Sequence, residues 1–135
     1  ISNRYRNTIA LLILHYIVKK YENEDIPPTA EDISENNQLP ARIVRQLLNQ
    51  LEEARIVAAT PVAAEAMGYL PAIDIHRLTL MEAITRLDSM GINSLPIGDA
   101  KSVENIKQLL ENISDRIALS DLNVLVKDMM NTNQN

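Results

Sequence analysis

Apolar residues recur over the first 54 positions at the spacing of amphipathic helices. One helix is predicted from Arg4 to about Glu22, and a short one follows in "TAEDISEN", where Thr29 and Asp32 form a capping-box pattern. After the turn "NNQLP", a third helix is predicted from Pro40 to Ala54, since proline is tolerated in a first turn. The expected inward positions are Ile9, Leu12, Ile13, Tyr16 and Ile17, then Ala30 and Ile33, then Ile43, Val44, Leu47, Leu48 and Leu51.

A β-hairpin is predicted next. β-Branched residues favour a first strand, the segment from Pro61 to Gly68 is expected to be a loop, and a second short strand follows. The strand positions are Ile56, Val57 and Thr60 in the first and Tyr69 and Leu70 in the second. Three helices followed by a hairpin is the order of a winged helix-turn-helix, with the hairpin as the wing.

Three further helices are predicted in the C-terminal part. Thr79 with Glu82 indicates a capped helix that ends at Met90, with Gly91 as its left-handed stop. Ser102 and Ser120 are expected to cap the other two. The expected inward or apolar positions are Leu80, Ala83, Ile84 and Leu87, then Val103, Ile106, Leu109, Leu110 and Ile113, then Leu122, Leu125 and Met129. These helices either pack on the winged helix or mediate dimerisation.

The predicted fold class is therefore mainly α, a winged helix-turn-helix with a small β-hairpin wing and additional C-terminal helices. Residues 1–135 are expected to form one domain, with a winged-helix core and N-terminal helix over 1–78 and a helical extension over 79–130. With 46% hydrophobic residues but no Phe or Trp, the core must be aliphatic.

The charge balance disfavours nucleic acid as the main partner. The net charge is −5, whereas phosphate binding depends largely on Lys and Arg. The chain has no cysteine, so it can form no disulfide, cysteine-ligated zinc site or iron–sulfur cluster of its own. We expect no cofactor.

The exposed side of the third helix is the candidate recognition surface, for a protein partner or for DNA. It offers Arg42, Arg45, Gln46 and Asn49, side chains that major-groove readers use on phosphates and base edges. Against DNA stand Glu52 and Glu53 at the end of this helix and a wing loop that holds Glu65 and no basic residue. A protein contact is therefore the preferred interpretation of this surface.

No metal site or catalytic centre is predicted. His15 and His76 are far apart in sequence and neither belongs to a metal-ligand spacing. The carboxylates are scattered along helix exteriors, whereas a metal-dependent nuclease would need them clustered. The domain is expected to be non-catalytic.

The N-terminal residues raise the question of a membrane. The apolar run "IALLILHYIV" is about half the roughly 20 residues that a membrane-spanning helix needs. Arg4 and Arg6 precede it, as in a chain that leaves a membrane on its cytoplasmic side, although an exposed first helical turn is the preferred explanation of these two residues alone. The chain begins without Met, inside a predicted helix, so we expect a soluble fragment of a longer protein.

Two families resemble these segments. "TAEDISENNQLPARIVRQLLNQLEEARIV" and "GYLPAIDIHRLTLMEAI" resemble winged-helix repressors that often carry a cysteine-bound iron–sulfur cluster. The cysteines and the glycine-rich, arginine-containing wing of those repressors are absent here, so the cluster is not carried over.

The whole chain resembles more closely the C-terminal extension of Bacteroidetes members of the YihY/BrkB family of inner-membrane proteins, often called ribonuclease BN-like. Three segments carry this resemblance: "RYRNTIALLILHYIVKKYE", "PPTAEDISENNQLPARIVRQLLNQLEEARIV" and "GYLPAIDIHRLTLMEAITRLDSMGINSLP". It implies a winged-helix domain on the cytoplasmic side of the bacterial inner membrane, and no active-site residue is transferred.

The preferred hypothesis is thus a non-catalytic accessory or interaction domain of such a membrane protein. Its partner would be another protein, the membrane portion of the same chain, or a second copy in a homodimer. The first alternative is a DNA-binding transcriptional regulator of the winged-helix repressor type. The second is a part of a tRNA-processing ribonuclease.

Overall fold

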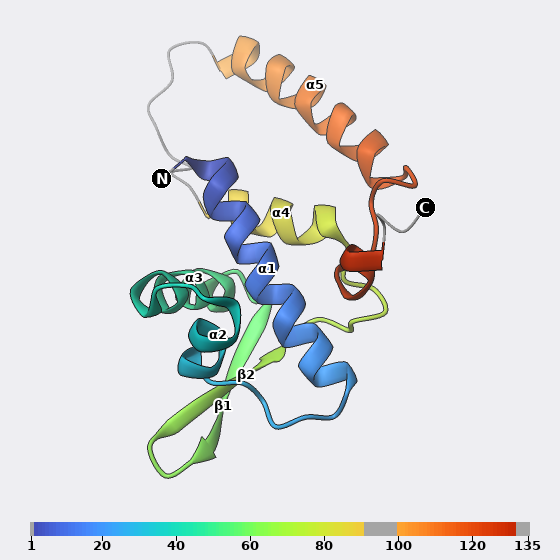
Figure 1. Ribbon diagram of the computed structural model, residues 1–135. Coiled ribbons are helices and arrows are strands. Elements are labelled where there is room, and N and C mark those ends of the chain that lie inside the picture. Colours follow the sequence, from blue (N-terminus) through green and yellow to red (C-terminus); the bar gives the residue numbers. More distant parts are fainter. Residues whose placement is uncertain (1, 91–99, 132–135) are drawn as a thin grey trace.

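The computed structural model describes residues 2–90 and 100–131, which form helices and one two-stranded antiparallel sheet that extends from the helices as a hairpin (Figure 1). In chain order the elements are α1 (Asn3–Glu22), α2 (Ala30–Asn37), α3 (Ala41–Glu53), β1 (Val57–Ala63), β2 (Ala66–Pro71), α4 (Leu80–Asp88), α5 (Ala100–Ala118) and the 3-10 helix η1 (Val126–Asn131). This is the predicted winged helix-turn-helix with added C-terminal helices.

Helix α1 runs through the middle of the domain and is packed against by α3, α4, β2 and η1. Ser2 caps its first turn, because the Ser2 side chain accepts a hydrogen bond from the Tyr5 backbone N–H. Its predicted inward stripe is confirmed at Ile9, Ile13 and Ile17, whereas Leu12 and Tyr16 lie at the half-buried edge. Among the described residues, no helix has both the length and the apolar character needed to cross a membrane.

The core is aliphatic, as the composition requires. Ile33 of α2 and four residues of α3 belong to the same buried cluster as the inner side of α1, and Ile56 and Val57 complete this cluster next to the wing. The fully or nearly fully buried α3 residues are Val44, Leu47, Leu48 and Leu51, while the predicted inward Ile43 is half-buried. Across residues 2–90 and 100–131, no polar or charged side chain is buried in this core.

The wing is a longer hairpin than the sequence predicts. Most of the segment expected as a loop belongs to strands, and the turn is confined to Ala64 and Glu65. The register shifts between Pro61 and Ala63, so an irregularity absorbs the proline, which has no N–H for the ladder. The prediction of a long loop was therefore wrong. Proline in a sequence argues against a strand, and the irregularity that accommodates Pro61 is visible only in the structure.

Gly68 lets the connection between α1 and α2 lie directly on the wing. A Cβ atom at Gly68 would be 2.4 Å from the Pro27 carbonyl oxygen and 2.7 Å from a methyl carbon of Val62. The Tyr69 N–H donates a hydrogen bond of 3.0 Å to the Pro28 carbonyl oxygen. Only a residue without a side chain allows this close backbone approach.

Helix α4 begins as predicted but ends earlier. Thr79 caps it, but Glu82 does not complete a capping box; its carboxylate pairs with the Arg86 Nε at 2.6 Å. Of the predicted inward residues, Ala83 and Leu87 are buried, and Leu80 and Ile84 are half-buried. Gly91, the predicted stop, lies outside the described residues.

The helix predicted after Ser120 was wrong. The segment forms a turn and then η1, and Leu122, expected to face inward, is 80% exposed. Instead the chain pairs with the segment before α4: the Val126 N–H donates to the Leu78 carbonyl oxygen and the Leu80 N–H donates to the Val124 carbonyl oxygen, at 2.9 and 2.8 Å. This long-range pairing replaces the local helical hydrogen bonds.

Helix α5 runs past α4 at the edge of the molecule (Figure 1). It starts at Ala100, so Ser102 lies within the helix and not at its cap. Every side chain from Lys101 to Leu119 is exposed. The predicted apolar side of this helix therefore exists, but it does not pack on the winged helix.

One titratable group in α1 makes stability depend on pH. Burial, followed by repulsion from Lys19, lowers the pKa of His15 below 6.5, while Glu22 opposes the shift. The unfolded chain therefore binds a proton at His15 more readily than the folded chain. The stability that neutral His15 contributes is fully present above about pH 6.5 and is lost as the pH falls below that value.

We expect the urea midpoint of unfolding to fall between about pH 7.5 and about pH 5.5, and the His15→Gln variant to show a smaller fall. The lowered pKa values of Glu22, Glu31 and Asp74 act below this window, since they start from 4.5 or 3.8. An equal decrease in both proteins would remove His15 as the cause.

Candidate functional site

The helix-turn-helix is formed by α2 and α3. Thr29 and Asp32 form the predicted capping box at the start of α2, and Gln38 ends this helix in the left-handed conformation, with φ of 54°. The Ser34 hydroxyl donates a 2.6 Å hydrogen bond to the Leu39 carbonyl oxygen, which ties the turn back to α2. Pro40 then leads into α3. The turn fixes the direction in which α3 leaves α2.

The outer face of α3 carries the four predicted recognition residues. Arg42, Arg45, Gln46 and Asn49 are all exposed, because they lie opposite the buried side of the helix. The helix has two flanks: Arg45 and Glu52 lie toward α2 and the wing, whereas Arg42 and Gln46 lie toward α1.

The flank of α3 toward the wing is acidic. An Arg45 Nη2 lies 2.5 Å from a Glu31 carboxylate oxygen, and this hydrogen bond lowers the pKa of Glu31. The pKa of the nearby Tyr69 is raised, first by burial and then by the negative charges of Glu52 and Glu31. Both members of the Arg45 pair are more than half exposed, so the pair contributes little to stability and opens readily. No local sequence pattern links residues 31 and 45, so this pair could not be predicted from the sequence.

The flank of α3 toward α1 is basic. A groove of about 370 Å³ separates the two helices, and its lining residues are Arg6 and Ile9 of α1 with Arg42, Ile43, Gln46 and Leu47 of α3. Arg6 donates a 2.7 Å hydrogen bond to the Asn3 side chain. Within residues 2–90 and 100–131, neither Arg6 nor Arg42 has an ion pair to a carboxylate. The sequence pattern predicted Arg6 as part of a membrane exit or of an exposed first turn, and did not predict its place beside α3.

Acidic residues bound this basic region on the far side of Arg6. A second cavity, of about 550 Å³, continues toward α4 and includes Glu53 and Asp88 in its lining. Asp88 accepts a 3.1 Å hydrogen bond from the Asn7 side chain. The basic groove is therefore local, and Arg6 lies at its border.

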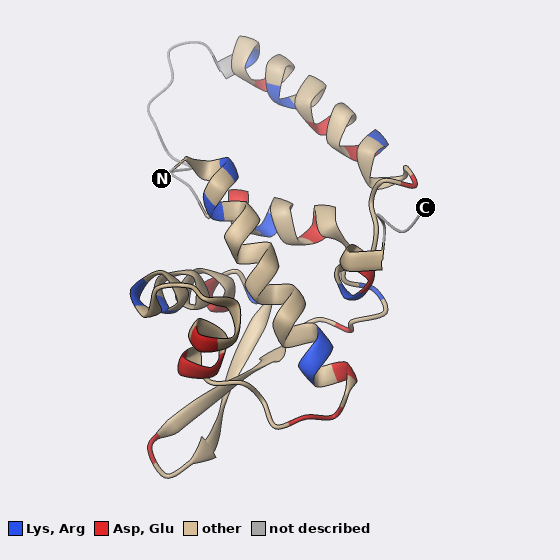
Figure 2. Ribbon diagram, viewed as in Figure 1, with Lys and Arg blue, Asp and Glu red and all other residues tan. Residues whose placement is uncertain are grey.

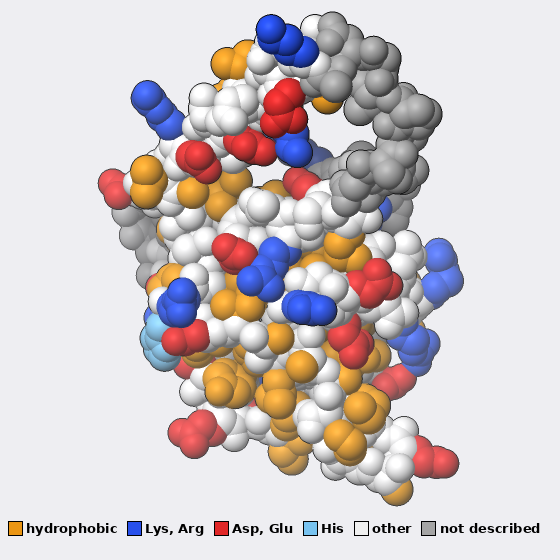
Figure 3. Space-filling view, turned by 180° about the vertical axis from the view of Figure 1, so that it is seen from behind, with side chains coloured by type: hydrophobic (Ala, Val, Ile, Leu, Met, Phe, Trp, Pro, Cys, Tyr) orange, Lys and Arg blue, Asp and Glu red, His pale blue; other side chains and the backbone are white. Residues whose placement is uncertain are grey.

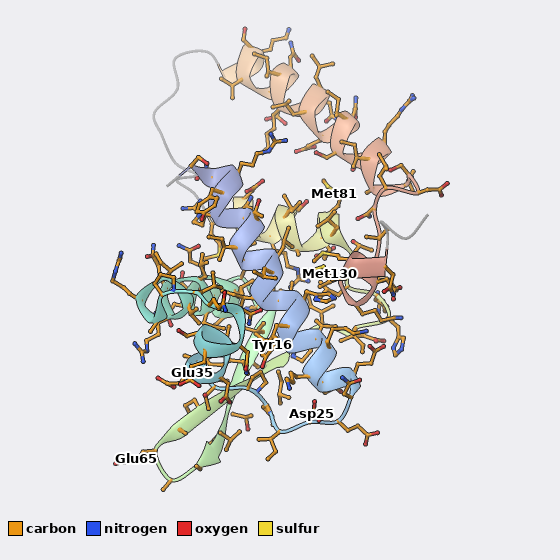
Figure 4. All side chains as sticks on the ribbon, in the orientation of Figure 1. Tyr16, Asp25, Glu35, Glu65, Met81 and Met130 are labelled. Atoms are coloured by element: carbon orange, nitrogen blue, oxygen red, sulfur yellow. The ribbon has the colours of Figure 1, made fainter. Side chains whose placement is uncertain are left out.

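The wing brings no positive charge to this surface. Its strands and turn hold one charged residue, Glu65, which lies at the tip (Figure 4). Figure 2 shows basic residues on α3 and at the start of α1 but none on the hairpin. Seen from behind, hydrophobic side chains gather on the lower part of the molecule, where the hairpin lies (Figure 3); Met67 is 45% exposed. The predicted lack of basic residues in the wing is thus a property of the whole hairpin.

The histidines take no part in this surface. His15 is half-buried in α1, and His76 is exposed after the wing with its Nδ1 3.3 Å from an Asp74 oxygen. In the part of the chain that the structure describes, no three His, Cys, Asp or Glu side chains are grouped to hold a metal ion.

No protein-family description and no curated protein matches the chain. Solved structures do match. IscR of T. potens superimposes with a TM-score of 0.62 at 16% identity, over 99% of this chain and 88% of that one. CymR, the global cysteine regulator of B. subtilis, gives 0.62 at 20% identity, over 98% of both chains. A candidate transcriptional regulator of Listeria innocua gives 0.56 at 20%, over 98% and 85%.

These similarities agree with the more distant of the two predicted resemblances, that to winged-helix repressors. No comparison supports the predicted origin in a YihY/BrkB-family membrane protein. At these identities the likeness concerns the fold. The chain has the winged-helix fold that IscR and CymR share, over nearly its whole length.

Proposed function

We propose that this domain is a non-enzymatic, DNA-binding transcriptional regulator of the winged-helix type. The observation that carries the proposal is the outer face of α3, where Arg42, Gln46 and Asn49 are exposed on the second helix of a helix-turn-helix. The likeness to CymR and to the Listeria protein, both described as regulators, supports the same role. The first alternative from the sequence thereby replaces the membrane accessory domain as the preferred function.

The side chains on α3 suit the edges of bases in the major groove. A recognition helix contacts bases mainly through its N-terminal residues, which places Arg42 and Gln46 foremost. An arginine can donate two hydrogen bonds to guanine, and glutamine or asparagine can do the same for adenine. Such a regulator would work in the cytoplasm, where the bacterial DNA is. This location agrees with the cytoplasmic part of the predicted location and requires no membrane.

The acidic surroundings limit how tightly the backbone can be held. Specific regulators that contact 6–10 phosphates lose roughly 10³–10⁵ in affinity between 50 and 200 mM salt. Here the wing has no Lys or Arg to contact phosphates, and Arg45 already forms an ion pair with Glu31. Affinity should therefore decrease with salt, but with a smaller slope than in regulators that have a basic wing.

The test is a titration of duplex DNA, selected from a random library, at several salt concentrations. We expect measurable binding at low salt that weakens as salt increases, and a further loss of roughly 10- to 100-fold on Arg42→Ala if that residue reads a guanine. Lys101→Ala, which removes a cation from α5, is the matched control and should change little. A flat titration at low salt overturns the proposal.

We further propose that the regulator is a homodimer joined through α5. Its apolar residues alternate at three and four positions, the heptad spacing of a coiled-coil seam: Val103, Ile106, Leu110, Ile113 and Ile117. All are at least 36% exposed. The side of α5 that lines a cavity toward α4 consists instead of Glu111, Ser114, Asp115 and Ala118. The polar side thus lies toward the domain and the seam is left for a partner.

A second copy of the same chain is the partner that fits this seam best. Two identical heptad seams are complementary to each other by symmetry, as closed dimers require. A dimer would also present two copies of α3, and regulators of this class read two half-sites in that way. Burying each leucine or isoleucine of the seam in a dimer would stabilise it by roughly 1.5–3 kcal/mol. A single chain lacks this contribution because the seam is exposed.

A further inference from the structure

Two arginines that are far apart in the sequence are brought together by the packing of α1 on α3. Arg6 comes from the first turn of α1 and Arg42 from the first turn of α3, and both line the 370 Å³ groove. No carboxylate belongs to the lining of this groove, whose other residues are three aliphatic side chains and Gln46. The site thus combines two guanidinium groups with an apolar floor.

The electrostatics of this groove suit an anion. The two guanidinium groups repel each other, and the apolar residues of the groove strengthen this repulsion because they lower the local dielectric constant. A bound anion would relieve the repulsion. The positive end of the α1 helix dipole adds to the charge of Arg6, and no acidic residue in the first turn of α1 offsets it. Guanidinium groups bind phosphate oxygens through paired hydrogen bonds, which makes a phosphate group the anion of best fit.

We infer that this groove binds one phosphate of the DNA backbone beside the recognition helix, with Arg6 as its donor and the positive charge of Arg42 adding to the attraction. The inference rests on the proposed DNA binding. It assigns to α1 the role that a basic wing plays in other winged-helix proteins. The reason is the asymmetry of charge around α3. On the wing side, Arg45 is paired with Glu31 of α2 and Glu52 adds a negative charge. On the α1 side, Arg6 of α1 lies beside Arg42.

Arg6→Ala is the first test, with Arg4→Ala as the matched control. Arg4 lies on the same turn of α1 and carries the same charge, but it does not line the groove. For Arg6→Ala we expect affinity to fall by about tenfold for every duplex sequence, because a backbone contact carries no base preference. The slope of log K against log salt should decrease by about 0.9. The control should change both quantities less.

Neutral methylphosphonate linkages, placed one at a time along the duplex, identify the phosphate itself. At one position per half-site, the neutral linkage should lower the DNA affinity of the wild-type protein about tenfold. The same linkage should not lower the affinity of Arg6→Ala any further. Inorganic phosphate, added at constant ionic strength, should compete only weakly, since one free anion lacks the other DNA contacts. Strong competition by inorganic phosphate would point to a free anion as the ligand and overturn the inference.

The outcomes separate the inference from the function on which it rests. If the wild-type protein binds DNA but Arg6→Ala matches Arg4→Ala, the groove makes no specific contact and the inference fails while the regulator remains. If the wild-type protein binds no duplex at low salt, both fail. Arg6→Lys guards against misfolding: it keeps the charge but loses the paired hydrogen bonds, so the salt slope should persist while affinity falls.

Discussion

Leu110→Asp in α5 is expected to convert the protein from a dimer to a monomer. Leu110 is at the centre of the seam and is 59% exposed in the single chain, so in the proposed dimer its replacement buries a carboxylate opposite the partner's identical residue. Light scattering after size exclusion should show a mass near 15.1 kDa instead of twice that value. The change should also weaken DNA binding by roughly 10² or more, because two linked recognition helices gain avidity over one.

Asn105→Asp provides the control for this experiment. It adds the same negative charge to α5, but Asn105 lies outside the heptad seam. The control should remain a dimer. A wild-type protein that is already monomeric at micromolar concentration would contradict the proposed dimer, and the apolar side of α5 would then need another partner.

Leu48→Ala is expected to destabilise the domain by roughly 2–5 kcal/mol, a large share of the 5–15 kcal/mol typical of a domain. Leu48 is fully buried between α3 and the rest of the core, and truncation leaves a cavity where it packed. Denaturant unfolding monitored by circular dichroism measures the change through the shift in midpoint.

Gln46→Ala separates stability from recognition. Gln46 is only two positions away on the same helix but is exposed, so its replacement should change the free energy of unfolding by less than about 0.5 kcal/mol. It should nevertheless weaken binding to the selected duplex. Similar losses of stability in both variants would show that α3 is not anchored through its aliphatic side.

The helices of the winged-helix core could be predicted because their signals are local. The spacing of Val44, Leu47, Leu48 and Leu51 within one helix fixes which side is buried, and Thr29 with Asp32 marks where α2 begins. The four exposed residues on α3 follow from the same periodicity.

Predictions failed where distant segments meet. Ser120 suggested a helix, but the pairing of Val126 with Leu78 gives the backbone long-range hydrogen bonds instead of helical ones. The strands of the wing extend past Pro61 because a register shift absorbs the proline. Neither effect is visible in a short window of sequence, since both depend on a neighbour in space.

The sequence by itself determined the winged-helix class, the aliphatic core and the composition of each helix face, because helical period, caps and composition are properties of neighbouring residues. The tertiary structure decided how the charges are shared. It paired Arg45 with Glu31, brought Arg6 to Arg42, and turned the polar side of α5 toward α4 so that the seam is exposed. The physical reason is that electrostatic interactions depend on distance in space, and packing sets this distance between residues that the sequence keeps far apart.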